Sequence, residues 1–411
     1  MVVKGQHNKS VDTQYGPGVF SLSGMSSPVE IVDQVISEAA KRGASDILLE
    51  PQEHEVAVRL RVDGVLQLYG TMSYGSYDQV LSRIKVLGNM DVTENRKPQE
   101  AKIRFETGDK HAYVLRAAVV STNFGQMAAL RVLDLPRFSG FTDLGLSNEM
   151  EEQIKKNVSG RYGLFLVCGP TGSGKTTTVH TCLKYLNTGG VNIMTTEDPI
   201  EYVIPGINQI EVGPEVGLDF AGGLRMLLRL NPDIVFVGEI RDSETAKIAV
   251  QASLTGHLVI STVHARNSVG ALYRLMDLGV DRYMVNNSVR AILAQRLMRK
   301  ICVQCKEEYS PDPDEIKVYE RERGKPPGVL ARGRGCEVCK NSQYKDRVGI
   351  FEMMQMDDGI RELVTRAAGE TEFNNQLLER GFETMNDQGW KLVDGGATSL
   401  SEYIRIMFDA K

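Results

Sequence analysis

Apolar and polar residues follow two different periods along this chain, and the change of period divides it in two. Between residues 27 and 134, short segments of alternating character lie beside two helical patterns. In the clearest segment, 56–62, every second residue is apolar, and the turn dipeptide Asp63-Gly64 follows it. We therefore expect a small α+β domain. Its helices are predicted at about 28–43 and 77–87, and its strands at about 46–50, 56–62, 65–68, 101–106, 112–120 and 126–133.

A second part follows residues 135–146, which we interpret as a linker because they contain Pro136, Gly140 and Gly145. Within 147–411, apolar segments at about 162–168, 191–196, 234–239 and 258–263 alternate with helical patterns. This order predicts an α/β domain whose mostly parallel sheet carries helices on both faces. Ligands of such sheets bind outside the carboxyl ends of the strands. Residues 1–26 are polar and lack either period, so we expect a flexible tail there.

One carboxyl end carries a complete G-x-x-x-x-G-K-[ST] phosphate-binding loop. The segment 164–168 is the apolar strand that such a loop needs before it, and a helical pattern continues to 186. An incidental Gly-rich turn is the alternative, but strand, loop and helix stand in the required order. The loop predicts that the chain binds ATP with Mg²⁺, with the lysine on the phosphates and Thr176 on the metal. The predicted nucleotide-binding residues are Gly169, Pro170, Thr171, Gly172, Ser173, Gly174, Lys175, Thr176 and Thr177.

Acidic residues follow two of the other predicted strands. Residues 196–201 contain three carboxylates where an ordinary turn would need one, and a solvated acidic turn is the alternative interpretation. The strand 234–239 has the shape of a Walker B strand, but Gly238 stands where a metal-holding Asp is usual. Phosphoryl transfer needs one carboxylate to orient water and another near Mg²⁺. We expect Glu197 to be the base and Glu239 to serve Mg²⁺ and its waters.

Two histidines flank the fourth predicted strand. His257 precedes it and His264 follows it, and we expect at least one of them to sense the γ-phosphate, although a structural histidine is the commoner case. Arg225, Arg229 and Arg241 lie around the acidic strand, where some of them will form surface ion pairs.

Four of the six cysteines form two C-x-x-C pairs. Two such pairs complete the tetrahedral thiolate shell of structural Zn²⁺, and the Pro- and Gly-containing segment between them is too polar to build a core alone. We therefore predict a zinc-binding insertion at 300–345, followed by C-terminal helices. Its ligands are Cys302, Cys305, Cys336 and Cys339, whereas Cys168 and Cys182 have no such partner.

The composition excludes several classes of protein. A net charge of −5 without a basic run argues against nucleic acid as a direct ligand. No apolar run reaches the roughly 18 residues that cross a bilayer, and the first residues lack a signal-peptide pattern. We expect a cytosolic chain whose thiols are free or bound to metal.

Together these motifs resemble the secretion ATPase superfamily, in particular the assembly ATPases of type IV pili (PilB) and of type II secretion (GspE). The similarity covers about residues 28–408. Leu48, Asn231 and the sequence at 98–101 depart from the usual patterns, but they lie outside the phosphate site. The motifs that carry the resemblance are residues 44–51, 61–64, 196–201, 231–242, 255–264 and 346–352, together with the cysteine pairs.

The resemblance implies a RecA-like ATPase domain, a PAS-like domain before it, and a homohexameric ring. It also implies arginines donated to a neighbour's nucleotide, for which Arg61 and Arg116 are the candidates, although solubilising charges are the simpler reading. In this family the ring works on the cytoplasmic face of the inner membrane, on a platform protein (PilC/GspF-like) and, indirectly, on pilins or pseudopilins.

Three alternatives remain open from the sequence. The first is a retraction motor (PilT-like), although such motors generally lack the four cysteines. The second is a nucleic-acid translocase, which would need a basic channel. The third is an ATP-binding regulator that does not hydrolyse ATP, which would lack Glu197 and Glu239. The sequence does not decide between a pilus, a secretion pseudopilus and a competence pseudopilus. The short segment before Ser27 favours a compact, competence-like version.

Overall fold

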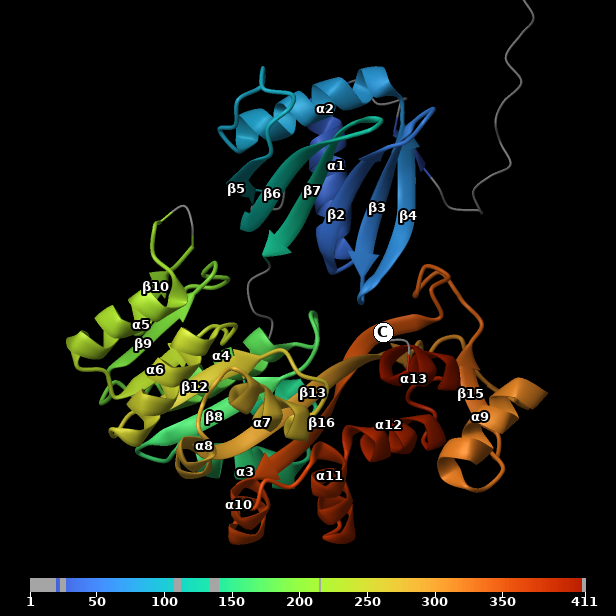
Figure 1. The fold of residues 1–411 in the computed structure, drawn as a ribbon. Coiled ribbons are helices and arrows are strands. Elements are labelled where there is room, and N and C mark those ends of the chain that lie inside the picture. Colours follow the sequence, from blue (N-terminus) through green and yellow to red (C-terminus); the bar gives the residue numbers. More distant parts are fainter. Residues whose placement is uncertain (1–19, 23–26, 107–111, 134–139, 214–215, 409–411) are drawn as a thin grey trace, which may run out of the picture. The chain divides into compact units, whose positions relative to one another are not determined.

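The computed structural model describes residues 20–22, 27–106, 112–133, 140–213 and 216–408. The chain divides into two compact units, residues 1–135 and 136–411, which are described separately (Figure 1). Most of the predicted tail and residues 135–139 of the predicted linker lie outside the described residues.

The first unit is a sheet with two helices on one face. Its strand order is β1-β4-β3-β2-β7-β6-β5, and all described neighbours are antiparallel except β1 and β4. The helices pack side by side, and their apolar stripes join the inward residues of the strands in one core. The elements are β1 (Phe20–Ser21), α1 (Pro28–Lys41), β2 (Ala44–Pro51), β3 (Val56–Val62), β4 (Val65–Met72), α2 (Tyr74–Leu87), β5 (Gln99–Glu106), β6 (Ala112–Thr122) and β7 (Gly125–Leu133).

These elements match the predicted α+β domain, with one correction at its start. Residues 20–22 were expected in a flexible tail, but Phe20 and Ser21 pair with Gly70 and Thr71 of β4. Leu22, which is 1% exposed, packs in the core of this unit. Three residues, two in a strand pair and one buried leucine, are too few to show the alternation of apolar and polar residues that marks a strand in the sequence.

The second unit contains a seven-stranded sheet in the order β10-β9-β11-β12-β8-β13-β16. All described neighbours are parallel except β16, which is antiparallel to β13. The predicted mostly parallel α/β sheet is therefore confirmed. Its strands are β8 (Gly163–Cys168), β9 (Ile193–Glu197), β10 (Asn208–Glu211), β11 (Ile234–Val237), β12 (Leu258–Val263), β13 (Val289–Ile301) and β16 (Tyr344–Gln355).

Helices cover both faces of this sheet. One face packs against η2 (Phe141–Leu144), α3 (Asn148–Val158) and α4 (Lys175–Leu186). In β8 alternate residues serve the two cores, because Phe165 and Val167 face α4 while Leu164 and Leu166 face the other side. The opposite face carries α5 (Phe220–Leu227), α6 (Ser243–Leu254), α7 (Ser268–Asp277), α8 (Arg282–Ser288), α10 (Asp358–Thr365), α11 (Glu370–Glu379), α12 (Met385–Asp394) and α13 (Leu400–Met407).

A small excursion separates β13 from β16. It contains β14 (Lys306–Tyr309), α9 (Pro313–Arg323) and β15 (Leu330–Gly333), and β14 pairs with β15 in a separate two-stranded sheet. Tyr319 of α9 stacks edge-on against Trp390 of α12 and anchors the excursion to the unit. Among the helices of the described residues, none is both long and apolar enough to cross a bilayer.

Candidate nucleotide site and metal centre

The phosphate-binding loop lies where β8 ends and α4 begins. β8 is fully buried, and α4 starts at Lys175 directly after Gly174, which has a φ of +87°. This left-handed conformation is easily adopted only by glycine, so the second fixed glycine of the motif turns the chain into the helix. No side chain caps this helix, so its first N–H groups remain available to an anion.

The Lys175 ammonium lies folded back on its own loop. Its Nζ donates to the backbone oxygens of Gly169 (2.9 Å) and Pro170 (3.0 Å). Burial lowers the pKa of Lys175, and the charge of Glu239 partly opposes that shift. Lys175 thus interacts electrostatically with Glu239, the acid that follows β11, although β12 lies between β11 and β8.

Glu239 lies at the centre of a small charged group. One carboxylate oxygen lies 2.9 Å from Nε2 of His264, and the other accepts a hydrogen bond from Nε of Arg241 at 2.7 Å. Burial and the charge of Lys175 lower the pKa of His264, so its imidazole is mostly neutral at pH 7. The structure thus brings Glu239 and His264 together beside Lys175.

The surroundings of Gly238, which stands where a metal-holding Asp is usual, leave little room for a side chain. Its N–H donates to the backbone oxygen of Thr196 (2.8 Å), and its own oxygen accepts from the hydroxyl of Thr262 (2.7 Å). A Cβ on Gly238 would lie 3.0 Å from the Thr196 oxygen and 3.3 Å from the ring of Phe220. An aspartate would therefore be crowded here, and Glu239 is the nearest acid that the strand can offer.

Glu197 occupies a different environment from Glu239, because it lies in a buried pocket against α4. Its side chain is 4% exposed and accepts hydrogen bonds from Thr195 (2.7 Å) and Gln209 (2.8 Å), and Nε2 of His180 lies 3.3 Å away. Burial alone would raise the pKa of Glu197, but His180, Gln209 and Thr195 together outweigh it and lower the pKa. The carboxylate is therefore ionised and held in one orientation.

The structure separates the two predicted histidines. His264 follows the carboxyl end of β12 and reaches Glu239, whereas His257 precedes the strand and places Nδ1 3.0 Å from the backbone oxygen of Ala252. Six residues of strand lie between them, which corresponds to about 20 Å. His257 thus lies at the amino ends of the strands, whereas the phosphate loop lies at their carboxyl ends. Of the nearby arginines, Arg225 forms an ion pair with Glu244.

The candidate arginines of the first unit lie in ion pairs with neighbouring strands. Arg61 and Arg116 are both partly exposed, with side chains 38% and 40% accessible. Their acidic partners belong to the same sheet. The pairs are Arg59 with Glu50 (2.6 Å), Arg61 with Asp46 (3.3 Å), Arg131 with Asp46 (3.0 Å) and Arg116 with Glu100 (2.7 Å).

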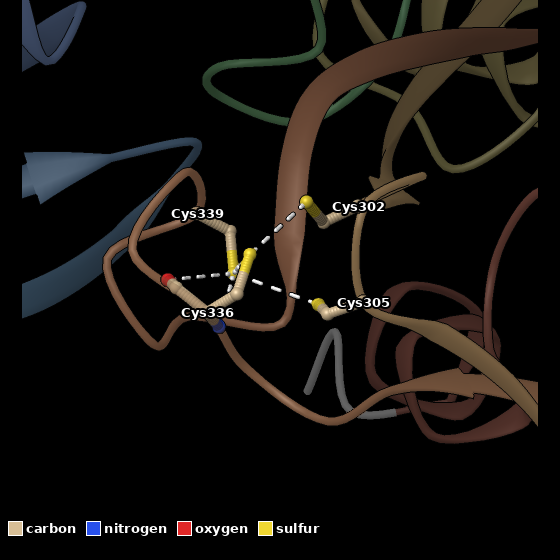
Figure 2. A group of neighbouring side chains, drawn as sticks. All are labelled: Cys302, Cys305, Cys336 and Cys339. Atoms are coloured by element: carbon tan, nitrogen blue, oxygen red, sulfur yellow. Dashed lines mark hydrogen bonds between the residues drawn. The ribbon is translucent and has the colours of Figure 1, made fainter.

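The four predicted zinc ligands converge from two loops (Figure 2). One pair follows β13 and the other follows β15, and the four sulfurs lie within 4.8 Å of one another. The closest sulfur–sulfur distances are 3.7 Å for Cys336–Cys339 and 3.8 Å for Cys302–Cys336 and Cys305–Cys339. These distances are far too long for disulfides. They match the edge of about 3.8 Å that four Zn–S bonds of about 2.3 Å give in a tetrahedron.

The donor set also has the chemistry that zinc requires. Backbone N–H groups reach the sulfurs, as in the 3.2 Å contact from the Cys336 amide to Sγ of Cys339. The backbone N–H groups of Cys339 and Val338 lower the pKa of Cys336 to about 7, whereas burial raises the pKa of Cys305 to about 11. The four convergent sulfurs fit a structural tetrathiolate site, in which the metal would hold both loops together.

Several residues of the site were not predicted from the sequence. His180 and Gln209 hold Glu197, and Gln295 of β13 reaches the phosphate loop. Each lies at least twelve residues from the group that it contacts, and none belongs to a motif. The only available signal was the position of His180 on the helix directly after the loop.

Comparison with known proteins places the chain in a family. Residues 22–405 match the family described as Type II/IV secretion system protein. The chain is 40% identical to the type IV pilus assembly ATPase PilB of Thermus thermophilus and to the type II secretion system ATPase E of Vibrio cholerae, in both cases over 92% of this chain. It spans 43% of the length of the first and 75% of the second.

Solved structures agree on the fold. The chain superposes on the ATPase DotB of Legionella pneumophila with a TM-score of 0.71 and 19% identity, covering 96% of this chain and all of that one. It also superposes on the pilus retraction motor PilT with bound ADP, with a TM-score of 0.60 and 26% identity over 92% of this chain and 97% of that one. The chain therefore belongs to the Type II/IV secretion system protein family, a family of ATPases.

Proposed function

We propose that this protein hydrolyses ATP with Mg²⁺ as the motor that assembles a type IV pilus or a related pseudopilus. The observation that carries this proposal is the group formed by Lys175, Glu239 and His264 at the carboxyl edge of the sheet. A lysine and an acid held together beside a phosphate loop suit the binding and cleavage of a nucleoside triphosphate.

The residues of the second unit have distinct roles in this proposal. The loop N–H groups and Lys175 bind the phosphates, while Thr176 and Glu239 hold the metal and its waters. Glu197 acts as the base that orients the attacking water, and His264 reports the γ-phosphate to Glu239. Bound Mg²⁺ would neutralise the charge that develops on the phosphate oxygens.

The larger assembly is also part of the proposal. We infer a homohexamer in which arginines of the first unit complete the nucleotide site of a neighbour. The ring acts at the cytoplasmic face of the inner membrane on a platform protein, and through it on pilins or pseudopilins. The identity of 40% to assembly and secretion ATPases supports this reading, as does the tetracysteine site.

ATP hydrolysis by the purified protein tests the enzymatic part. We expect Mg²⁺-dependent release of phosphate that Lys175→Ala abolishes, because the substitution removes the cation that bridges loop and phosphates. Lys156→Ala, at an exposed position of α3, is the matched control and should keep the wild-type rate. A Lys175→Ala protein that hydrolyses ATP normally would show that the loop is not the active site.

Two further measurements separate the alternatives. Hydrolysis that DNA or RNA stimulates, and that falls steeply with salt, would indicate a nucleic-acid translocase instead. In the native cells, loss of an assembly motor should remove surface fibres while their subunits remain inside, whereas loss of a retraction motor should leave more fibres than normal.

A further inference from the structure

Gln295 lies in the sheet directly behind the phosphate loop. It belongs to β13, the strand that neighbours β8, and the register places Ala294 opposite Cys168, the last residue before the loop. Its side chain points to the α4 face of the sheet, and the residue is 2% exposed. A glutamine at this depth must satisfy both ends of its amide within the protein.

The amide of Gln295 bridges the loop and the helix that follows it. Nε2 donates to the backbone oxygen of Ser173 at 2.7 Å, and Oε1 accepts from the hydroxyl of Thr178 at 2.8 Å. The carbonyl of Ser173 can only accept, so the amide has one possible orientation. One side chain thus fixes the loop to the first turn of α4.

The two outer glycines of the motif leave the space that this contact needs. A Cβ on Gly169 would lie 2.4 Å from the backbone oxygen of Gln295, and a Cβ on Gly174 would lie 3.2 Å from its Nε2. Any larger residue at Gly169 would push β13 away from the loop. Glycine at both positions therefore leaves room for the backbone and side chain of Gln295 against the loop, as well as for phosphate.

From this geometry we infer that Gln295 is a positioning residue for the phosphate loop, acting through the Ser173 backbone. The inference rests on the proposed binding of ATP. Lys175 now bonds to the oxygens of Gly169 and Pro170 and must release both to reach phosphate. The bond from Gln295 to Ser173 does not involve Lys175. It therefore preserves the shape of the loop while the lysine changes partners.

Two substitutions of Gln295 test the role by different routes. Gln295→Glu keeps the size of the side chain and the bond from Thr178, but it replaces the donor to Ser173 with a carboxylate oxygen that repels that carbonyl. Gln295→Leu removes both hydrogen bonds. Gln388→Leu is the control, because Gln388 of α12 also accepts a partly buried hydrogen bond, from the Phe351 N–H at 2.9 Å, away from the phosphate loop.

Measurements on the whole chain of residues 1–411 at 25 °C would use a fluorescent ATP analogue with Mg²⁺ for the Kd. Steady-state hydrolysis would give kcat and KM, and thermal unfolding without nucleotide would give the stability. For both Gln295 variants we expect the Kd and KM to rise at least about tenfold, the equivalent of one lost buried hydrogen bond. Gln388→Leu should lower the unfolding temperature without changing the Kd, since a general loss of stability does not alter nucleotide affinity far below unfolding.

A folded Gln295→Glu protein with the wild-type Kd and KM would overturn the inference. If both Gln295 variants fail to fold, Thr178→Val decides, because it releases Oε1 of Gln295 with little change of volume. We expect its Kd to rise about threefold, a fraction of one hydrogen bond, and an unchanged Kd overturns the inference. Failure of the wild-type protein to hydrolyse ATP would instead contradict the proposed function, while the Kd comparison would still test Gln295.

Discussion

Glu197 and Glu239 show how one sheet edge gives two carboxylates different properties. Glu239 lies between His264 and Arg241, and its charge acts on Lys175 of the phosphate loop. Glu197 is nearly inaccessible and is held by uncharged donors and His180. A fixed, ionised acid suits a base, whereas an acid among cations suits a metal shell.

Glu197→Gln separates binding from turnover. The amide keeps the size of the side chain but cannot take a proton from water, so kcat should fall about 10²–10⁴-fold while the Kd for ATP stays the same. Phosphate release and nucleotide binding on the same preparation measure the two quantities. Asp198→Asn, a change of the exposed neighbouring acid, serves as the control and should keep most of the turnover. Normal hydrolysis by Glu197→Gln would exclude Glu197 as the base.

The sequence predicted those residues of the site that local motifs mark. The phosphate loop and the cysteine pairs are short patterns whose chemistry depends on adjacent residues, so they could be read directly. Gln295 contacts Ser173, which lies 122 residues away, and no local pattern marks it. His257 and His264 flank the same strand, and only their contacts in the fold show that His264, and not His257, lies beside Glu239.

At the scale of elements, β13 connects the parts of the second unit. It pairs with β8 on one side and β16 on the other, reaches the loop through Gln295, and runs directly into Cys302. The sequence did not reveal it as a strand, because polar residues interrupt its apolar pattern, and several of them make specific contacts. Arg299, for example, binds Glu402 of α13.

Glu402 makes the docking of α13 on β13 sensitive to pH. Its fully buried carboxylate accepts from Arg299 (2.7 Å) and Arg405 (2.6 Å). Burial opposes ionisation, but these arginines outweigh it and lower the pKa of Glu402 below 4.5. The stabilisation is therefore present above that ordinary value and is lost as the pH falls through the lower value of the folded protein.

Glu402→Gln should reduce the free energy of unfolding by about 3 kcal/mol at pH 7, because it leaves two arginines without a buried counter-charge. The difference from wild type should shrink as the pH falls below 4.5, where the wild-type carboxyl also becomes neutral. Urea unfolding across this pH range measures both effects. At Glu152, whose side chain is 76% exposed, the same change should cost less than about 1 kcal/mol. If the free energies of unfolding of Glu402→Gln and wild type differed by the same amount at every pH, this account would be refuted.

The excursion between β13 and β16 should depend on metal. Cys302→Ser removes one of four thiolates, so we expect zinc to fall from one ion per chain to well below one, and residues 300–345 to become sensitive to protease. Metal analysis and limited proteolysis of the reduced protein check this. Cys182→Ser alters a buried cysteine outside the cluster and should leave the zinc content unchanged. Wild-type protein that contains no zinc would contradict the assignment.

At the scale of the whole molecule, the arginines of the first unit pose the main mechanistic question. In the isolated chain Arg61 and Arg116 are bound to Asp46 and Glu100 on their own sheet. Such partly exposed pairs contribute only about 0–1 kcal/mol, so a phosphate group on another subunit can compete for the guanidinium. The hexamer itself and the PAS-like character of this unit stay predictions from the family resemblance.

Arg61→Ala and Arg116→Ala test whether the nucleotide site is completed by a neighbouring subunit. An arginine from a neighbouring subunit that stabilises the charge of the transition state raises kcat on the order of 10³-fold. At least one variant should therefore lose that much activity in assembled hexamers. Because neither side chain lies in the core, both variants should keep the wild-type unfolding temperature. Arg42→Ala, on the helical face of the same unit, is the control. Adding a hydrolysis-deficient Lys175→Ala subunit that retains both arginines should restore turnover at the intact sites of the mixed ring. If both arginine variants hydrolyse ATP normally as hexamers, these two arginines do not act across subunits.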